Sequence, residues 1–574
     1  MSLSGALNAA KTSLFTNQKG IEITGNNISN VNTPGYSRQK LMLSDFPSLS
    51  FGNLFVGQGV KASGIAREYD IFVAEQLLDK SRLLGAEDAK QTPLAELERV
   101  FNVGEENLAT EIDRFFDSWQ ELSANPSGQV ERDMVLQRGE ILAKQFNTIA
   151  RDLDTVSTNI NSTIKSEVDS INLKLQQIAD LNNRIQAIET GTGQSANSFR
   201  DTRDVLLQEL TFTLGVQSFE ERGGAVNVQL PGGLPLIQGS SALELQAIET
   251  GADISLQLKI GEATFAIKDK NLGGKFAGLM EIRDELIPTL KQDLDYTAYQ
   301  MVQEVNSIHE QGEGLDGLSG RPFFQNPGRH ESQAYPTNDF AGFKGGDIKI
   351  TVDGEEYIIN LGLATDQFSL EDVASAINVA RDGSAGPPVI PGIPGIGSAS
   401  ARELGDGGFV LDILPAYNPA TKGNSSISMD MSAIRDSYEA PKFSMPSMSN
   451  LIAMALKDPS KVAAGSSSAP GDNTKALEIT ALKDKKAVNG EDTFVGFYAK
   501  MAARVGIEAS QNRLERAGAQ DALTQLNNMR DGVAGVSLEE EMIALIKYQR
   551  GFEASARMLS IVDEMMETII SIKR

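Results

Sequence analysis

His309 and His330 are the only imidazole side chains in the sequence, and cysteine is absent. His309-Glu310-Gln311-Gly312 begins like a zinc-protease motif, but that motif needs a second histidine four residues after the first, on the same helical face. We interpret this segment as a polar helix end at Gly312. Without cysteine the chain has no thiol nucleophile, no thiolate metal ligand and no disulfide.

Other motifs that carry chemistry are also missing from the sequence. It contains neither a G-x-x-x-x-G-K-[ST] phosphate loop nor a G-x-S-x-G nucleophile elbow. Aspartate and glutamate are so common that no acid and base pair stands out. We therefore expect no catalytic residue, no metal site and no cofactor, and we predict that the protein is not an enzyme.

Charge and length narrow the class of protein further. The 574 residues include 77 acidic and 52 basic side chains, a formal net charge of −25. Such a balance disfavours nucleic-acid binding, which needs an excess of Lys and Arg, and is typical of a solvated surface. The sequence contains no run of 18 apolar residues, so we expect no transmembrane helix. The first 30 residues lack the apolar core of a cleaved signal peptide.

Both ends of the sequence show apolar residues at seven-residue spacing, which is typical of helices that pack along one seam. The predicted assembly seam consists of Leu7, Leu14, Ile21, Ile28, Leu538, Leu545, Phe552, Leu559 and Met566. We predict that the two terminal helices pack against each other and against neighbouring copies. The alternative is that each seam is the buried face of an ordinary amphipathic helix.

The first of these helices must end at the segment that follows it. Pro34 pushes Thr33 out of the α region, and Pro34-Gly35 suits the centre of a type II turn, where glycine supplies a positive φ. Asn30 and Asn32 can bond the backbone groups that the helix end leaves free. At the other end of the chain, Ser537 and Glu540 form a predicted capping box.

These two terminal segments resemble the flagellar axial proteins, the rod, hook and hook-associated family. The resemblance at the N-terminal end rests on Asn30, Asn32, Pro34, Gly35, Tyr36, Ser37, Arg38 and Gln39. The C-terminal resemblance rests on Gly535 to Met542, Tyr548-Gln549 and Ala554 to Arg557. Both ends are similar to the hook-associated members in particular.

The resemblance implies a structural subunit of the hook–filament junction, needed for filament attachment and growth. Its implied partners are copies of itself, the hook protein, the third hook-associated protein (FlgL) and an export chaperone that covers the C-terminal helix. It implies an extracellular location, reached through the flagellar type III pathway without a cleaved peptide. The alternatives are another axial protein, such as a hook or distal-rod subunit, or an outer insert with adhesin or hydrolase activity.

We predict an α+β multidomain fold, with terminal helices in a coiled coil, a long helical bundle body and two β-rich inserted outer domains. A terminal domain would comprise 1–50 and 535–574, and the body 51–210, 275–320 and 471–534. Alternating strands at 226–230 and 254–260 predict a β insert over 211–274. A second insert, 321–470, contains a segment at 369–378 that resembles the flagellin IN motif.

Overall fold

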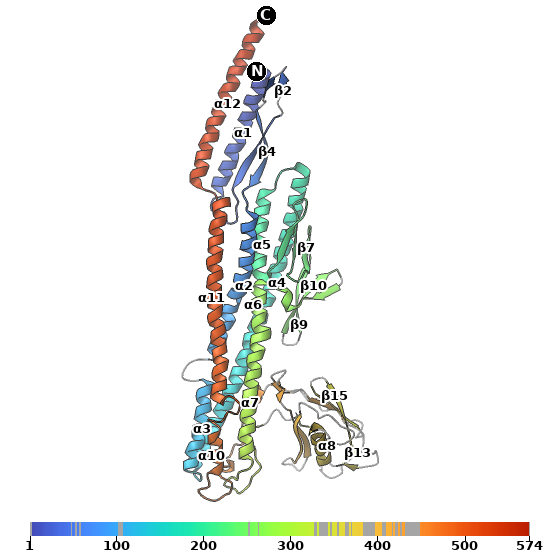
Figure 1. The fold of residues 1–574 in the computed structure, drawn as a ribbon, viewed down its shortest axis with the longest axis vertical. Helices are drawn as coiled ribbons and strands as arrows, with labels where there is room; N and C mark the ends of the chain where they lie inside the picture. The colour runs from blue at the N-terminus through green and yellow to red at the C-terminus, as the bar shows by residue number, and fades with distance from the viewer. Residues whose placement is uncertain are drawn as a thin grey trace. The chain divides into compact units, whose positions relative to one another are not determined.

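The computed structural model is mostly helical with several small sheets (Figure 1), which agrees with the predicted α+β class. It describes residues 3–46, 49–51, 54–56, 59–101, 107–250, 253–261, 263–325, 330–331, 343–344, 347–352, 355–361, 367–368, 370–382, 396–403, 409–415, 417–418, 423–424, 427–430, 448–488 and 490–572. The chain forms two compact units. The first unit comprises Met1–Pro93, Thr158–Ile282 and Ser510–Arg574, and the second comprises Leu94–Ser157 and Arg283–Ala509.

The two ends of the chain lie together in the first unit. Helix α1 (Leu3–Ser29) lies beside helix α12 (Leu538–Ile572), as Figure 1 shows. Strands β1 (Gln39–Asp45) and β4 (Val60–Arg67) form an antiparallel ribbon that contacts α1. Between them, β2 (Leu49–Phe51) and β3 (Leu54–Val56) form a second short hairpin. Gly52, Gly57 and Gly59 in the segment after the turn predict irregular structure or short hairpins, and the described strands form short hairpins.

The rest of the first unit is built on long helices. They are α2 (Ile71–Val100), α4 (Gln129–Thr192), α5 (Asn197–Leu214), α6 (Gly274–Glu281) and α11 (Phe494–Ala534), three of which continue into the second unit. Val73 and Leu77 of α2 pack on Leu523 and Leu526 of α11. Isoleucines at seven-residue spacing (Ile164, Ile171, Ile178 and Ile185) predict one long helix from about Arg132 to Thr190, and α4 confirms it. The sequence pattern predicts two separate helices near 70–84 and 94–101, but this prediction is wrong, because a single helix, α2, continues through Pro93.

Two small sheets of the first unit are bonded to α4. One is ordered β5 (Gln217–Glu220), β6 (Val226–Gln229), β7 (Pro235–Gln238), β8 (Ser241–Ala242), and the other β11 (Ala263–Ala266), β10 (Asp253–Ile260), β9 (Glu244–Thr250). The Asn182 amide exchanges hydrogen bonds with the backbone of Val226. Asn172 does the same with Leu245. Two asparagines on one helix therefore hold one sheet each.

An aromatic core fills the centre of the second unit. It joins α3 (Leu108–Ala124) to the segment after α7 (Ile287–His309) and to the start of α11, beside the short helices α9 (Met448–Leu451) and α10 (Thr474–Ala481). The fully buried rings are those of Phe115, Phe116, Trp119, Phe323, Phe324 and Phe494. A π-helical turn (Ile282–Leu286) precedes Pro288 at the start of α7, because proline cannot continue a regular ladder.

A separate β-rich part of the second unit has its own core. The described strands are β12 (His330–Glu331), β13 (Phe343–Lys344), β14 (Asp347–Val352), β15 (Glu355–Asn360), β16 (Gln367–Phe368), β17 (Ile396–Glu403), β18 (Phe409–Pro415), β19 (Tyr417–Asn418), β20 (Gly423–Asn424) and β21 (Ile427–Asp430). Helix α8 (Leu370–Asp382) covers them with the buried Val373 and Ile377. The segment 369–378, for which the sequence predicts a helix capped by Ser369, is helical from Leu370 onward, and Ser369 itself lies outside the described residues.

His309 is the last residue of α7, at the predicted helix end, and its buried ring belongs to the aromatic core. Its Nδ1 bonds the carbonyl of Arg321 (2.7 Å), and its Nε2 accepts the N–H of Ala463 (2.9 Å). Its ring lies 6.2 Å from that of Trp119. Burial lowers the pKa of His309 to about 4, so the ring is neutral at pH 7. Both ring nitrogens therefore have structural partners.

We expect the free energy of unfolding to decrease as the pH falls from 6.5 toward 4. In that window the unfolded chain protonates His309 while the buried ring stays neutral, at a cost of roughly 3 kcal/mol over the whole range. Urea unfolding followed by Trp119 fluorescence, the only tryptophan signal, measures this. The His309→Gln variant should lose stability less steeply, and an equal slope in both proteins would contradict the assignment.

Candidate assembly site: the paired terminal helices and their turn

The two terminal helices run antiparallel in a register that three contacts define. Ser13 Oγ lies 2.8 Å from Ser555 Oγ, and Asn27 Nδ2 donates to Glu541 Oε2 (3.1 Å). Between them Gly20 lies against the ring of Tyr548. Each contact is seven residues from the next on both helices, so one line of small and polar side chains forms the centre of the pair.

The predicted apolar seam lies beside this line. Leu14, Ile21 and Ile28 each follow a contact residue of α1 by one position and are half-buried, as is Leu7. On α12, Leu545, Phe552 and Leu559 are half-buried. Each lies four positions after a contact residue of the same helix, which is Glu541, Tyr548 or Ser555. Leu538 and Met566 are exposed, at 49% and 36%.

Sequence reasoning missed the polar half of the contact. A search for apolar residues at seven-residue spacing passes over two sets of residues that show the same spacing: Ser13, Gly20 and Asn27 on α1, and Glu541, Tyr548 and Ser555 on α12. This seven-residue spacing of small and polar residues, beside the apolar seam, was the signal that could have identified the contact residues. A small residue is needed where the helices approach closely, because a Cβ on Gly20 would lie 2.5 Å from the Tyr548 ring.

The turn after α1 has the predicted geometry. The Tyr36 N–H bonds the carbonyl of Thr33 (3.2 Å), and Gly35 has a φ of 76°. Asn30 donates to the carbonyl of Asn26 (2.9 Å) and so caps the helix end. Pro34 and Asn32 are exposed. Gly35 has a second constraint, because a Cβ there would lie 2.2 Å from Val205 of α5.

Asn27 is the centre of the site, at 1% exposure. Its Oδ1 accepts bonds from the Tyr36 hydroxyl (2.8 Å) and the Gln39 N–H (3.0 Å). Its Nδ2 donates to the Gln39 carbonyl (3.0 Å) and to Glu541. Burial, with Asp201 and Glu541 nearby, raises the pKa of Tyr36 to about 12, so its hydroxyl keeps its proton. One amide thereby joins α1, the turn, β1 and α12.

Arg38 joins the turn to the start of α12. Its Nε donates to Glu541 (2.7 Å) and its Nη1 to Glu540 (2.8 Å), while its N–H bonds the carbonyl of Ala534 (2.8 Å). The Glu541 residue is 2% exposed. The predicted capping box is therefore modified: Ser537 Oγ accepts the Glu540 N–H at 3.5 Å, but the Glu540 carboxylate pairs with Arg38.

Ser37 and the end of β4 connect this cluster to α5. The Ser37 N–H donates to Asp201 Oδ2 (3.1 Å). Arg67 bonds Asp201 (2.9 Å) and Asp204 (2.7 Å). Burial raises the pKa of Asp204 against the opposing effect of Arg67. The arrangement has the chemistry of a structural clamp, in which charges are paired and the amide groups are hydrogen-bonded.

Two other kinds of site are missing from the described part of the chain. No group of three His, Asp or Glu side chains there could hold a metal ion. Every helix among the same residues is too short or too polar to span a bilayer.

Comparison with known proteins agrees with the terminal resemblance. Family models described as "Flagella basal body rod protein" and "Flagellar basal body rod FlgEFG protein C-terminal" match residues 6–36 and 533–572. A third, "Flagellar hook-associated protein FlgK helical domain", matches residues 94–324. These matches define the class: a flagellar axial protein whose two ends pair.

Curated relatives extend the similarity to the whole chain. Flagellar hook-associated protein 1 of Escherichia coli (strain K12) is 26% identical over all of both chains. Its counterpart from Bacillus subtilis (strain 168) is 26% identical over 98% of this chain and 97% of its own length. The chain is therefore similar over its whole length to flagellar hook-associated protein 1, and together with the family models these similarities support a flagellar hook-associated axial protein.

A solved structure shares the fold. The flagellar hook junction protein FlgK from Burkholderia pseudomallei aligns with a TM-score of 0.53 at 19% identity. The alignment covers 80% of this chain and all of that one.

We expect Gly20→Ala to weaken the α1–α12 pair by roughly 1–3 kcal/mol, because the new methyl group overlaps the Tyr548 ring. Gly25→Ala on the same helix is the matched control, since nothing lies within 4 Å of its Cβ. The probe is a Ser13→Cys/Ser555→Cys pair in the otherwise cysteine-free chain, whose disulfide reports pairing. Equal disulfide formation with Gly20→Ala and Gly25→Ala would refute the close contact.

We expect Glu541→Ala to destabilise the junction of the turn with α12 by about 1–3 kcal/mol, because Asn27 and Arg38 then lose a buried acceptor. Hydrogen exchange of the first turns of α12 and the last turns of α1 should accelerate. Glu539→Ala, at an exposed position in the same helical turn, should leave exchange unchanged. Unaltered exchange in Glu541→Ala would rule out the clamp.

Proposed function

We propose that this protein is a structural subunit of the junction between flagellar hook and filament, required for filament attachment and growth. The observation that carries the proposal is the combination of axial-protein matches at both termini with a hook-associated helical domain between them. The relatives named flagellar hook-associated protein 1 cover the full length, which favours this role over that of a hook or distal-rod subunit. The Burkholderia protein that shares the fold is itself described as a hook junction protein, which is consistent with the same location.

We propose the terminal helix pair as the polymerising element. In the single chain α12 leaves an apolar face exposed, formed by Met542, Ile543, Ile546, Met558, Ile561, Met565 and Ile569. These residues form two exposed apolar groups, 542–546 and 558–569, and exposed apolar groups on a helix indicate a protein contact. The half-buried seam residues Leu545, Phe552 and Leu559 border it. In this proposal the Asn27–Arg38–Glu541 cluster sets the angle at which the pair meets the body.

The domain division and partners follow from this assignment. Residues 1–50 and 535–574 would form the assembly domain, and the 211–274 and 321–470 segments would be outer inserts. The proposed partners are copies of the same chain, the hook protein, the third hook-associated protein (FlgL) and an export chaperone on α12. Export would use the flagellar type III pathway, without a cleaved signal peptide, to an extracellular site.

Deletion of the gene tests the proposal. We expect cells with bare hooks and monomeric flagellin in the medium, because the filament would lack the layer on which it grows. Electron microscopy scores the hooks, an immunoblot of the medium scores flagellin, and a strain complemented with the wild-type gene is the control. Intact filaments on the deletion strain would refute the junction role.

A further inference from the structure

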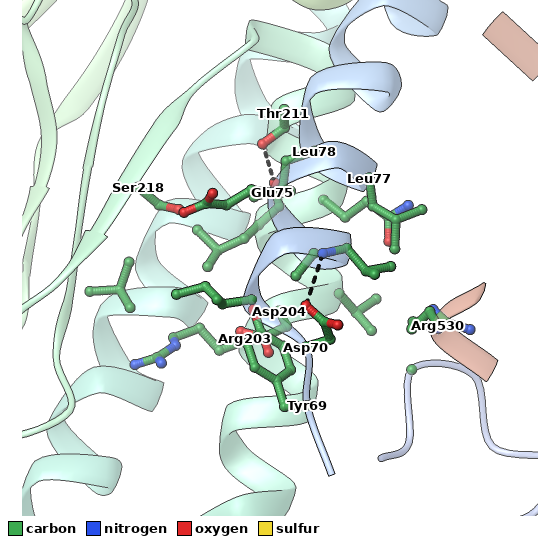
Figure 2. A pocket seen from close by; sticks show the side chains of 18 of the residues that line it. Tyr69, Asp70, Glu75, Leu77, Leu78, Arg203, Asp204, Thr211, Ser218 and Arg530 are labelled. Atoms are coloured by element: carbon green, nitrogen blue, oxygen red, sulfur yellow. Dashed lines mark hydrogen bonds between the residues drawn. The ribbon is translucent and has the colours of Figure 1, made fainter. Parts of the chain in front are cut away.

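Two concave sites of the first unit differ in the chemistry of their walls. A cavity of about 550 Å³ lies beside the turn, and its walls come from the turn, α2, α5, β5 and the end of α11. Figure 2 shows Tyr69 and Asp204 close together in the cavity, with Arg530 at the edge of the view. All four arginines on its walls form ion pairs within the chain. The second site is a groove on the terminal helix pair, and its lining contains sulfur.

The groove has a volume of about 680 Å³ and is formed mainly by α12, with Ala6 of α1 as a further lining residue. Met558, Ile561 and Met565 line it and are 40%, 51% and 48% exposed. Met558 and Met565 are seven residues apart, so both lie on the same side of the helix. Two thioether groups are therefore open to solvent in one groove of the single chain.

Methionine is concentrated on α12. The chain has 16 methionines, and four of them, Met542, Met558, Met565 and Met566, lie on this one helix of 35 residues. All four are exposed in the single chain, by between 36% and 53%. Exposed thioethers thus gather on the helix that carries the proposed assembly contact.

These thioethers are oxidisable, and no thiol of the chain competes with them. The chain has no cysteine, so methionine is its only sulfur-containing residue. When a thioether meets hydrogen peroxide, a sulfur lone pair attacks one oxygen atom, the S–O bond forms and the O–O bond breaks. The sulfur loses two electrons to the peroxide, and the products are a sulfoxide and water.

A sulfoxide changes what the groove can bind. A methionine thioether is flexible and packs well on apolar surfaces, whereas a sulfoxide oxygen is polar and accepts hydrogen bonds. Arg550 and Arg557 line the same groove, and their N–H groups are donors that can bond this oxygen while the groove is open. An apolar partner surface excludes water and supplies no donor. Oxidation therefore favours the open groove over the covered one.

We propose that Met558 and Met565 form an oxidation site that controls assembly. The thioether form of the subunit joins the growing structure, and the sulfoxide form does not. The proposal rests on the polymerising role proposed for the terminal helix pair and adds its regulation by a peroxide. A methionine sulfoxide reductase reverses the step, because two thiols supply the two electrons and leave as a disulfide while the oxygen leaves as water.

Peroxide treatment of the free full-length chain tests the site. The dose leaves the buried Met280 and Met301 unmodified, and peptide mass spectrometry measures the sulfoxide at each methionine. The protein is then incubated with hooks isolated from the deletion strain, and bound protein is measured after sedimentation. We expect at least tenfold less binding once Met558 and Met565 are oxidised, and recovery after treatment with methionine sulfoxide reductase and dithiothreitol.

Two double variants assign the effect to these side chains, with the ratio of binding after peroxide to binding before it as the readout. Met558→Leu/Met565→Leu keeps the apolar volume and removes both sulfur atoms, so its ratio should stay near one. Met134→Leu/Met529→Leu changes two exposed positions outside the groove, and its ratio should fall at least tenfold, as in the wild type. Equal ratios in the two variants would overturn the assignment.

The outcomes separate this inference from the proposed function. Unchanged binding of a wild-type chain that is fully oxidised at Met558 and Met565 would overturn the oxidation site and leave the junction role intact. Oxidation of these two residues at the same rate in purified flagella as in free subunits would also overturn it, because assembly would then leave the groove open. Failure of the untreated chain to bind hooks would overturn both.

Discussion

The buried bond between Asn27 and Glu541 is the interaction on which the terminal structure depends, and it joins residues 514 positions apart. A carboxylate that is nearly inaccessible to water is costly unless its oxygens have charged or polar partners. Asn27 and Arg38 are these partners of Glu541. Asn27 can bond Glu541 only where the turn places Tyr36 and Gln39 against the remaining atoms of the Asn27 amide. The ends of the chain therefore meet in one arrangement.

The line of small and polar residues gives the helix pair a unique register. Two helices that present only leucine-type residues every seven positions can slide by seven residues at little cost, whereas a buried polar contact is satisfied in one alignment. Ser13–Ser555, Gly20–Tyr548 and Asn27–Glu541 each have a different chemistry. A shift by seven residues would place Asn27 against Tyr548 and leave Glu541 without Asn27.

The same short turn positions the helix pair and the β1/β4 ribbon. Gly35 closes the turn, approaches Val205 of α5 and forms part of the cavity wall. Ser37 binds Asp201, which in turn binds Arg67 at the base of the β1/β4 ribbon. The orientation of the helix pair and of the ribbon is therefore set by a few residues that contact one another directly.

The sequence by itself determined the local features, because these depend on residues close in the chain. Pro34-Gly35 determined a type II turn through the fixed φ of proline and the positive φ open to glycine, and the heptad of isoleucines in α4 determined a long helix. Only the tertiary structure decided which polar residues matter. The seven-residue spacing that includes Asn27 and Glu541 does not say what they bond, because their roles come from a partner on the other terminal helix. The apolar line that periodicity selected lies beside the contact and not at its centre. The cavity likewise combines the turn, α2, α5, β5 and α11, which are brought together only by folding.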